Sequence, residues 1–127
     1  MSLRLMLSAA VVCVCVAPIV LAQDAVKTDP KHYTVVSEND QVRILKVHYG
    51  AHEKSVMHSH PNGVAVFLND GNARFTFPDG KTRDLPVKAG DAQYTPATVH
   101  LPENTGSAPF DLIVIEFKGT AGTAKAK

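Results

Sequence analysis

Short runs of β-branched and aromatic residues, separated by turn residues about every eight to twelve positions, limit what this chain can fold into. Two such runs, 64–68 and 73–77, flank the turn sequence Asn69-Asp70-Gly71-Asn72, which favours a hairpin between them. The last run, FDLIVIEF at 110–117, is apolar at both parities over 112–115, so we expect both of its faces to be covered. Beyond the N-terminal leader, no segment has sustained helical periodicity. The pattern predicts an all-β sandwich or barrel without separating the two.

The N-terminus has the pattern of an export leader. Arg4 precedes an almost wholly apolar run at 5–21, and Val20-Leu21-Ala22 has the small residues at −3 and −1 that a signal peptidase accepts. Pro18 interrupts the run and polar residues begin at Gln23, which argues against a transmembrane anchor. We therefore expect cleavage after Ala22 and a periplasmic or secreted protein without a stable membrane anchor.

The sequence divides into four parts. We expect a signal peptide at 1–22, a flexible N-terminal segment at 23–31, a β-domain at 32–119 and a disordered tail at 120–127. The segment at 23–31 has no periodic apolar pattern, and the tail contains only Ala, Gly, Thr and Lys, so neither offers an apolar face to bury.

Charge and cysteine content restrict the partners and the means of stabilisation. Cys13 and Cys15 both lie in the leader, so the mature chain must rely on its core instead of disulfides. Without Arg4, 12 of the 13 basic residues remain beside 12 acidic ones, and the mature chain is formally neutral. Nucleic acid is therefore not an expected partner.

The segment His58-Ser59-His60 is the first candidate for chemistry. Residues two apart on a strand point to the same face, so both imidazoles can converge on one point. Neutral imidazole binds first-row divalent metals well. An isolated His-x-His is more often two partly exposed strand histidines, so its surroundings have to decide.

Those surroundings resemble the cupin superfamily over about residues 50–104. The first cupin motif is a glycine, His-x-His, a glutamate and a second glycine. Here it reads Gly50, His58-Ser59-His60 and Gly71, with Val64 where the glutamate ligand usually stands. The second motif is represented by Gly90, Pro96, His100 and Asn104, with Thr98 in place of a usual glycine.

The resemblance implies a single antiparallel jelly-roll (cupin) β-barrel that holds a divalent transition metal through His58, His60 and His100. The metal could be Fe, Zn, Mn, Ni or Cu, and no other cofactor is implied. Without a glutamate at Val64, the site is similar to the three-histidine centres of some cupin dioxygenases. Cupins commonly pair through sheet edges, so the resemblance also implies a homodimer.

An apolar pocket for a small-molecule ligand is expected beside the histidines. Its expected lining is Val64, Val66, Phe67, Phe75 and Phe77, and one of Gln93 and Tyr94 should face it. No catalytic residue is indicated. Three classes stay open: a metal-dependent enzyme of oxygenase type, a non-catalytic metal- or ligand-binding barrel, and a scaffold that binds nothing.

The remaining polar residues have weaker interpretations. Glu103 should lie on the face opposite His100. Asn104 is expected to close the turn at Thr105-Gly106. His48 is either a hydrogen-bonding support for the site or a strand-end residue. His52 is expected in a surface loop, and His32 is assigned no function.

Overall fold

The computed structural model describes residues 23–119, so the predicted leader at 1–22 and tail at 120–127 lie outside the described residues. One short helix and nine strands occur in the described part. They are α1 (Ala25–Thr28), β1 (Tyr33–Glu38), β2 (Val42–Tyr49), β3 (His58–His60), β4 (Gly63–Phe67), β5 (Gly71–Thr76), β6 (Thr82–Val87), β7 (Ala92–Thr95), β8 (Thr98–Asn104) and β9 (Phe110–Phe117). Among these described elements, no helix is long and apolar enough to cross a bilayer.

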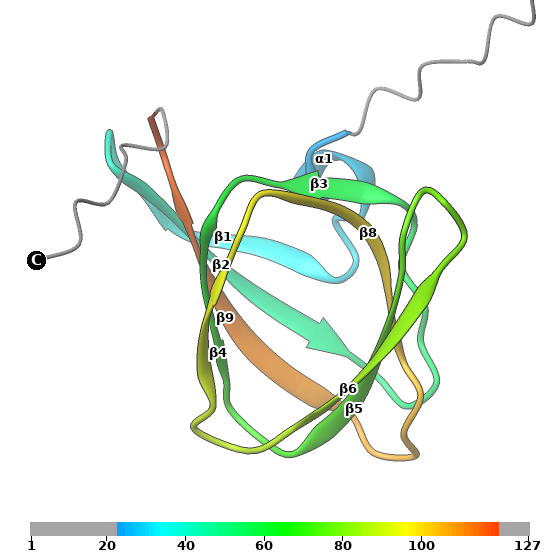
Figure 1. Ribbon diagram of the computed structural model, residues 1–127. Coiled ribbons are helices and arrows are strands. Elements are labelled where there is room, and N and C mark those ends of the chain that lie inside the picture. Colours follow the sequence, from blue (N-terminus) through cyan, green and yellow to red (C-terminus); the bar gives the residue numbers. More distant parts are fainter. Residues whose placement is uncertain (1–22, 120–127) are drawn as a thin grey trace, which may run out of the picture.

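The strands form two antiparallel sheets that enclose the interior of the domain (Figure 1). One sheet has the order β1-β2-β9-β4-β7 and the other has the order β3-β8-β5-β6. The all-β, antiparallel prediction is therefore confirmed. The described strands make two open sheets and not the single closed barrel that we expected.

The turn at 69–72 does not produce the predicted hairpin. β4 pairs with β7 and β9, whereas β5 pairs with β6 and β8, so this turn carries the chain from one sheet to the other. The Asp70 carboxylate accepts a hydrogen bond of 3.0 Å from the backbone N–H of Ala89, which ties the turn to the loop before β7. Turn residues in the sequence indicate a reversal, but they do not say which strands pair.

The core lies between the sheets and follows strand alternation. Leu45, Val47 and Tyr49 of β2 are buried, while the intervening Lys46 and His48 are exposed. Buried partners come from both sheets: Tyr33, Ala65, Phe67, Ala73, Val87, Phe110 and Leu112. Full burial of one large apolar side chain contributes about 1.5–3 kcal/mol, so these residues hold the two sheets together.

Strand β4 presents the opposite face from the one that we expected. Ala65 and Phe67 are buried and face the interior, whereas Val64 and Val66 are half-buried and point outward. The register agrees, because Ala65 lies opposite Val114 of β9. The prediction that Val64 and Val66 line the pocket is wrong, since both parities of this strand are apolar and composition could not distinguish them.

The segment at 23–31 is folded against the sheets, unlike the flexible segment that we expected. Asp24 caps α1 by accepting hydrogen bonds from the backbone N–H groups of Val26 and Lys27. Ala25 is fully buried, and the backbone N–H of Ser59 donates to the carbonyl of Gln23 at 2.8 Å. A single capping residue and one buried alanine give no periodic pattern, which is why the sequence did not reveal this packing.

Candidate metal centre

The four-stranded sheet brings His58, His60 and His100 to one point. His58 and His60 lie on β3, and His100 lies opposite His58 on the neighbouring strand β8. The ring centroids are 4.8–5.4 Å apart, and the three rings are nearly perpendicular to one another. One nitrogen from each ring lies within 4.8 Å of the others. The structure thus gathers the three residues that the sequence singled out as metal ligands.

Hydrogen bonds at Nδ1 turn two of these rings toward a common point. Nδ1 of His58 lies 2.8 Å from the carbonyl oxygen of Val56, and Nδ1 of His60 lies 2.6 Å from the carboxylate of Glu116. Since carbonyl and carboxylate oxygens accept, both Nδ1 atoms carry the proton. In the neutral form of each ring, Nε2 then keeps its lone pair, and the two Nε2 atoms face each other at 3.0 Å.

The donor set fits a divalent transition metal. Two nitrogens at right angles around one ion, each about 2.1 Å from it, are about 3.0 Å apart, as are the Nε2 atoms of His58 and His60. Nε2 of His100 is buried without a hydrogen-bond partner among the described residues. A buried unsatisfied polar atom costs about 1–3 kcal/mol, and a metal ion would satisfy it.

Burial keeps the imidazoles ready for coordination. Burial, and next the neighbouring His60, lower the pKa of His58 to about 4. The same two causes, together with the charges of His58 and Arg83, lower the pKa of His100 to about 3. Both rings are therefore neutral at pH 7, which is the state that coordinates a metal.

Glu116 on β9 is a site residue that the sequence analysis missed. Its side chain is 2% exposed, and its carboxylate accepts hydrogen bonds from Nδ1 of His60 at 2.6 Å and from Nε of Arg43 at 2.7 Å. Arg43 also forms an ion pair with Asp24, the residue that caps α1. The sequence did carry a signal for it. Glu116 is a charged residue four positions after Leu112, so both side chains point to the same, buried face of the strand.

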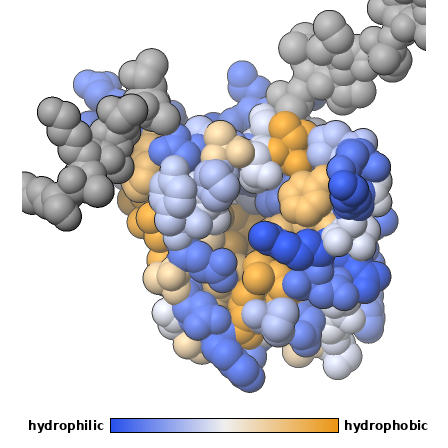
Figure 2. All heavy atoms as spheres, in the orientation of Figure 1, coloured by the Kyte–Doolittle hydropathy of each residue, from blue (hydrophilic) through white to orange (hydrophobic). Residues whose placement is uncertain are grey.

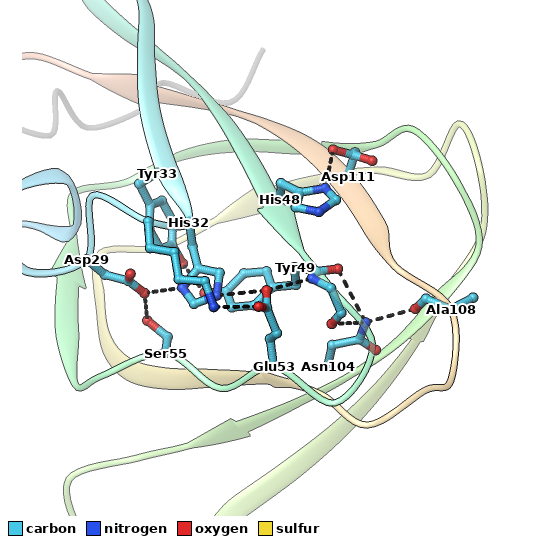
Figure 3. A network of polar contacts seen from close by, with 12 residues as sticks. Asp29, His32, Tyr33, His48, Tyr49, Glu53, Ser55, Asn104, Ala108 and Asp111 are labelled. Carbon is cyan, nitrogen blue, oxygen red and sulfur yellow. Dashed lines mark hydrogen bonds and ion pairs between the residues drawn. The ribbon is translucent and has the colours of Figure 1, made fainter.

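A second polar network approaches the site from the N-terminal segment (Figure 3). His32 lies between two carboxylates, with Nδ1 2.6 Å from Asp29 and Nε2 3.2 Å from Glu53. Ser55 donates a hydrogen bond to the same Asp29, and its Oγ lies 3.3 Å from Nδ1 of His58. His32, to which the sequence analysis assigned no function, thus belongs to a network that reaches a candidate ligand.

Two tyrosines form the wall next to the histidines. The hydroxyl groups of Tyr33 and Tyr49 are 2.8 Å apart, and the Tyr33 ring packs edge-on to His58 with centroids 4.9 Å apart. Burial raises the pKa of both hydroxyls above the ordinary tyrosine value. Both tyrosines therefore stay protonated and hydrogen-bonded near neutral pH.

A cavity of about 320 Å³ opens beside His60 and His100. Aromatic and aliphatic side chains line it, and the aromatic ones are Tyr33, Tyr49, Phe67, Phe75, Phe77, Tyr94 and Phe110. Figure 2 shows a hollow on this face, with apolar side chains inside and hydrophilic ones around its rim. Gln93 lies opposite the inward-facing Ala65 in the sheet register and faces the interior, whereas Tyr94 borders the cavity and is 64% exposed.

The other polar residues lie outside the cluster. Asn104 is fully buried and closes the turn as expected, because its amide donates to the carbonyl of Gly50 and its oxygen accepts from Gly106. Glu103 lies 3.9 Å from Lys54 and takes no part in the site. The expected alternative that His48 supports the ligands is wrong, because its half-exposed ring is paired with Asp111. His52 is exposed, as predicted, and has a positive φ of 59°.

Comparison with known proteins agrees with this fold. The family model described as "Cupin domain" matches residues 32–116, and the chain therefore belongs to the cupin family. No protein of curated function is similar enough to the chain to count as a relative.

Three solved structures illustrate the likeness. A cupin domain from Bordetella pertussis is 21% identical, with a TM-score of 0.64, and the match covers 68% of this chain and 92% of that one. A Klebsiella pneumoniae protein with a double-stranded β-helix domain is 27% identical, with a TM-score of 0.56 and coverage of 71% and 78%. The DMSP lyase DddQ from Ruegeria pomeroyi is 22% identical, with a TM-score of 0.51, and the match covers 76% of this chain but 51% of the lyase. At this identity, the match to the lyase shows a shared fold alone.

Proposed function

We propose that this cupin protein binds one divalent transition-metal ion through His58, His60 and His100 and holds a small molecule in the adjoining cavity. The observation that carries the proposal is the buried Nε2 atom of His100, which has no partner among the described residues, on a ring that offers a nitrogen within 4.8 Å of those of His58 and His60.

A scaffold that binds nothing explains these contacts poorly. Three buried imidazoles lose their hydration, and Nε2 of His100 gains no hydrogen bond in return. At the same time, Val56 and Glu116 hold His58 and His60 in the tautomer that coordination requires. Such support of ring orientation is what a histidine metal site requires.

The open side of the cluster supports an enzyme. Three protein ligands leave coordination positions free, and His60 and His100 both line the cavity. A metal bound there supplies Lewis-acid chemistry or a place for dioxygen, and the aromatic wall excludes water and orients an apolar substrate. We propose a metal-dependent, oxygenase-like activity, with a non-catalytic metal- or ligand-binding protein as the alternative.

Metal content of variants tests the proposal. The protein is purified from the export compartment of its host, and the bound metals are measured for wild type, His58→Ala, His100→Ala and His48→Ala. His48 is the matched control, since it is a strand histidine paired with Asp111 outside the cluster. We expect about one ion per chain in wild type and in the His48 variant, and less than about a tenth of that in the other two. Equal content in wild type and a triple variant lacking all three histidines would refute the site.

Export and pairing are proposals of the same kind. We propose that residues 1–22 are removed as a leader and that the protein works in the periplasm or outside the cell, because the pattern from Arg4 to Ala22 is that of a signal peptide.

We also propose a homodimer. Ile44, Val64 and Ile115 form a half-buried apolar stripe across the outer face of the larger sheet, and a second copy packed there would cover it.

A further inference from the structure

Arg83 brings a positive charge to the inner face of a sheet. It lies on β6 directly opposite Phe75 of β5, and residues paired in this way share one face. Phe75 faces the cavity, and both residues line it. Apart from the histidines, Arg83 is the one ionisable cation among the residues that line the cavity. The arginine is exposed, so it stands at the mouth of the cavity.

No carboxylate in the described part of the chain pairs with Arg83. Arg43 binds Asp24 and Glu116, and Arg74 binds Asp84 through two hydrogen bonds, so the other two arginines of residues 23–119 are neutralised. The guanidinium of Arg83 instead lies over the Phe75 ring, 5.8 Å from its centroid. A guanidinium held this way keeps its N–H groups available for a planar anion.

Phe75 connects this charge to the candidate metal centre. Its ring centroid is 4.6 Å from that of His100 on one side, and the Arg83 guanidinium lies over the same ring. Since both distances start from the same ring centroid, the guanidinium lies no more than about 10 Å from the centre of the His100 ring. A small molecule with a ring or a short alkyl body has the length to reach from one to the other.

We propose that the cavity binds a small organic acid, with its carboxylate on Arg83 and its apolar body against Phe75 and the neighbouring rings. The far end of the acid then lies at the three histidines, and in this respect the inference rests on the proposed metal site. The cavity volume of about 320 Å³ is at the lower end of the range for small-molecule sites, about 300–1,000 Å³, which limits the acid to a compact one.

An inward-pointing charge on an edge strand has another use, and the experiment must distinguish it. β6 is the last strand of its sheet, and a charge there can discourage pairing with another chain. That role requires no ligand. Under it, Arg83 would have no influence on which small molecules enter the cavity.

Binding of a matched acid and amide decides between these uses. The probes are 3-phenylpropionate and 3-phenylpropionamide, titrated into zinc-loaded wild type, Arg83→Gln and Lys81→Gln by calorimetry, with zinc content measured in each sample. Lys81 is the control, because it is an exposed cation of the same hairpin and does not line the cavity. Wild type and Lys81→Gln should bind the acid about fivefold more tightly than the amide, which is the upper end of the range for an exposed ion pair. Arg83→Gln should bind the two probes equally and retain its zinc.

Two outcomes overturn the inference. One is an unchanged preference for the acid in Arg83→Gln, which would place the carboxylate on the metal instead. The other is that wild type binds neither probe or binds both alike. If no sample holds zinc, the comparison of acid and amide in the metal-free protein still tests Arg83, and the metal content of the histidine variants tests the proposed metal site separately.

Discussion

Replacement of Glu116 by glutamine tests how the site is held. The substitution keeps the size of the side chain and removes its charge. In the wild type, the carboxylate accepts from Nδ1 of His60 at 2.6 Å, which leaves Nε2 of that ring free for the metal. An amide can accept through its oxygen alone, and its NH₂ group would meet a donor of either His60 or Arg43. Loss of such a support typically reduces metal affinity about 10- to 100-fold, and we expect a change in that range.

The effect on stability follows from the contacts of Glu116. Its second oxygen accepts from Nε of Arg43 at 2.7 Å and lies 2.6 Å from Nη2. Removing one partner of a fully buried ion pair costs about 3–5 kcal/mol. Arg43 retains Asp24, however, and is 17% exposed, so water and the second carboxylate compensate part of the loss. We expect the metal-free variant to lose about 2 kcal/mol of unfolding free energy, or roughly 10 °C in Tm.

The control lies on the same strand. Asp111 of β9 also accepts a hydrogen bond from a histidine, Nδ1 of His48 at 2.9 Å, but His48 is 54% exposed and outside the cluster. Asp111→Asn should change stability by less than about 0.5 kcal/mol and leave the metal affinity unchanged. Urea unfolding without metal measures stability, and competition with a chelator measures affinity. A folded Glu116→Gln protein with metal affinity within about threefold of wild type would refute the role of Glu116.

Three further predictions concern acid stability, Val64 and the leader. The pKa values of about 4 for His58 and about 3 for His100 lie below the unfolded value of about 6.5. Between pH 4 and 6.5 the unfolded chain therefore binds more protons than the folded protein. As the pH falls through this range, the unfolding free energy of the metal-free protein should decrease by about 1.4 kcal/mol per pH unit for each of these histidines. Urea unfolding beside a His58→Ala/His100→Ala variant isolates this slope, and parallel profiles would contradict it. Val64→Glu should leave metal affinity unchanged, because Val64 faces outward. A higher metal affinity of the variant, measured by competition with a chelator, would show that residue 64 faces the site. Mass spectrometry of the exported protein should show that residues 1–22 are missing, and an intact N-terminus held in the membrane would rule out the leader.

The fold class and two of the three candidate ligands could be read from local patterns. Alternation with period two places His58 and His60 on one face without any knowledge of the rest of the chain. His100 is 40 residues from His60, and local patterns do not link them. It entered through the resemblance to the second cupin motif, and the register of β3 with β8 supplies the physical contact.

The face of Val64 could not be predicted by counting. Between His60 and Gly63 the chain leaves β3 in one sheet and enters β4 in the other. Strand parity is defined within a strand, so it does not carry across residues 61 and 62. The spacing of the motif places a residue near the site, but the pairing of β4 with β9 decides whether its side chain faces inward.

The missing glutamate and the buried Glu116 are therefore connected. Gly63 of β4 lies opposite Glu116 in the register, and a Cβ atom at Gly63 would lie 2.1 Å from the carbonyl oxygen of Ile115. The strand that would carry a glutamate ligand thus packs closely against the backbone of β9, and its first inward position has no room for a side chain. The carboxylate near the site comes instead from β9, and it contacts Nδ1 of His60. Because it contacts the ring and is not one of the three clustered donors, it would strengthen His60 as a ligand of the proposed metal and leave the coordination positions that face the cavity open. A three-histidine centre with a carboxylate behind one ring is therefore the arrangement that this strand register favours.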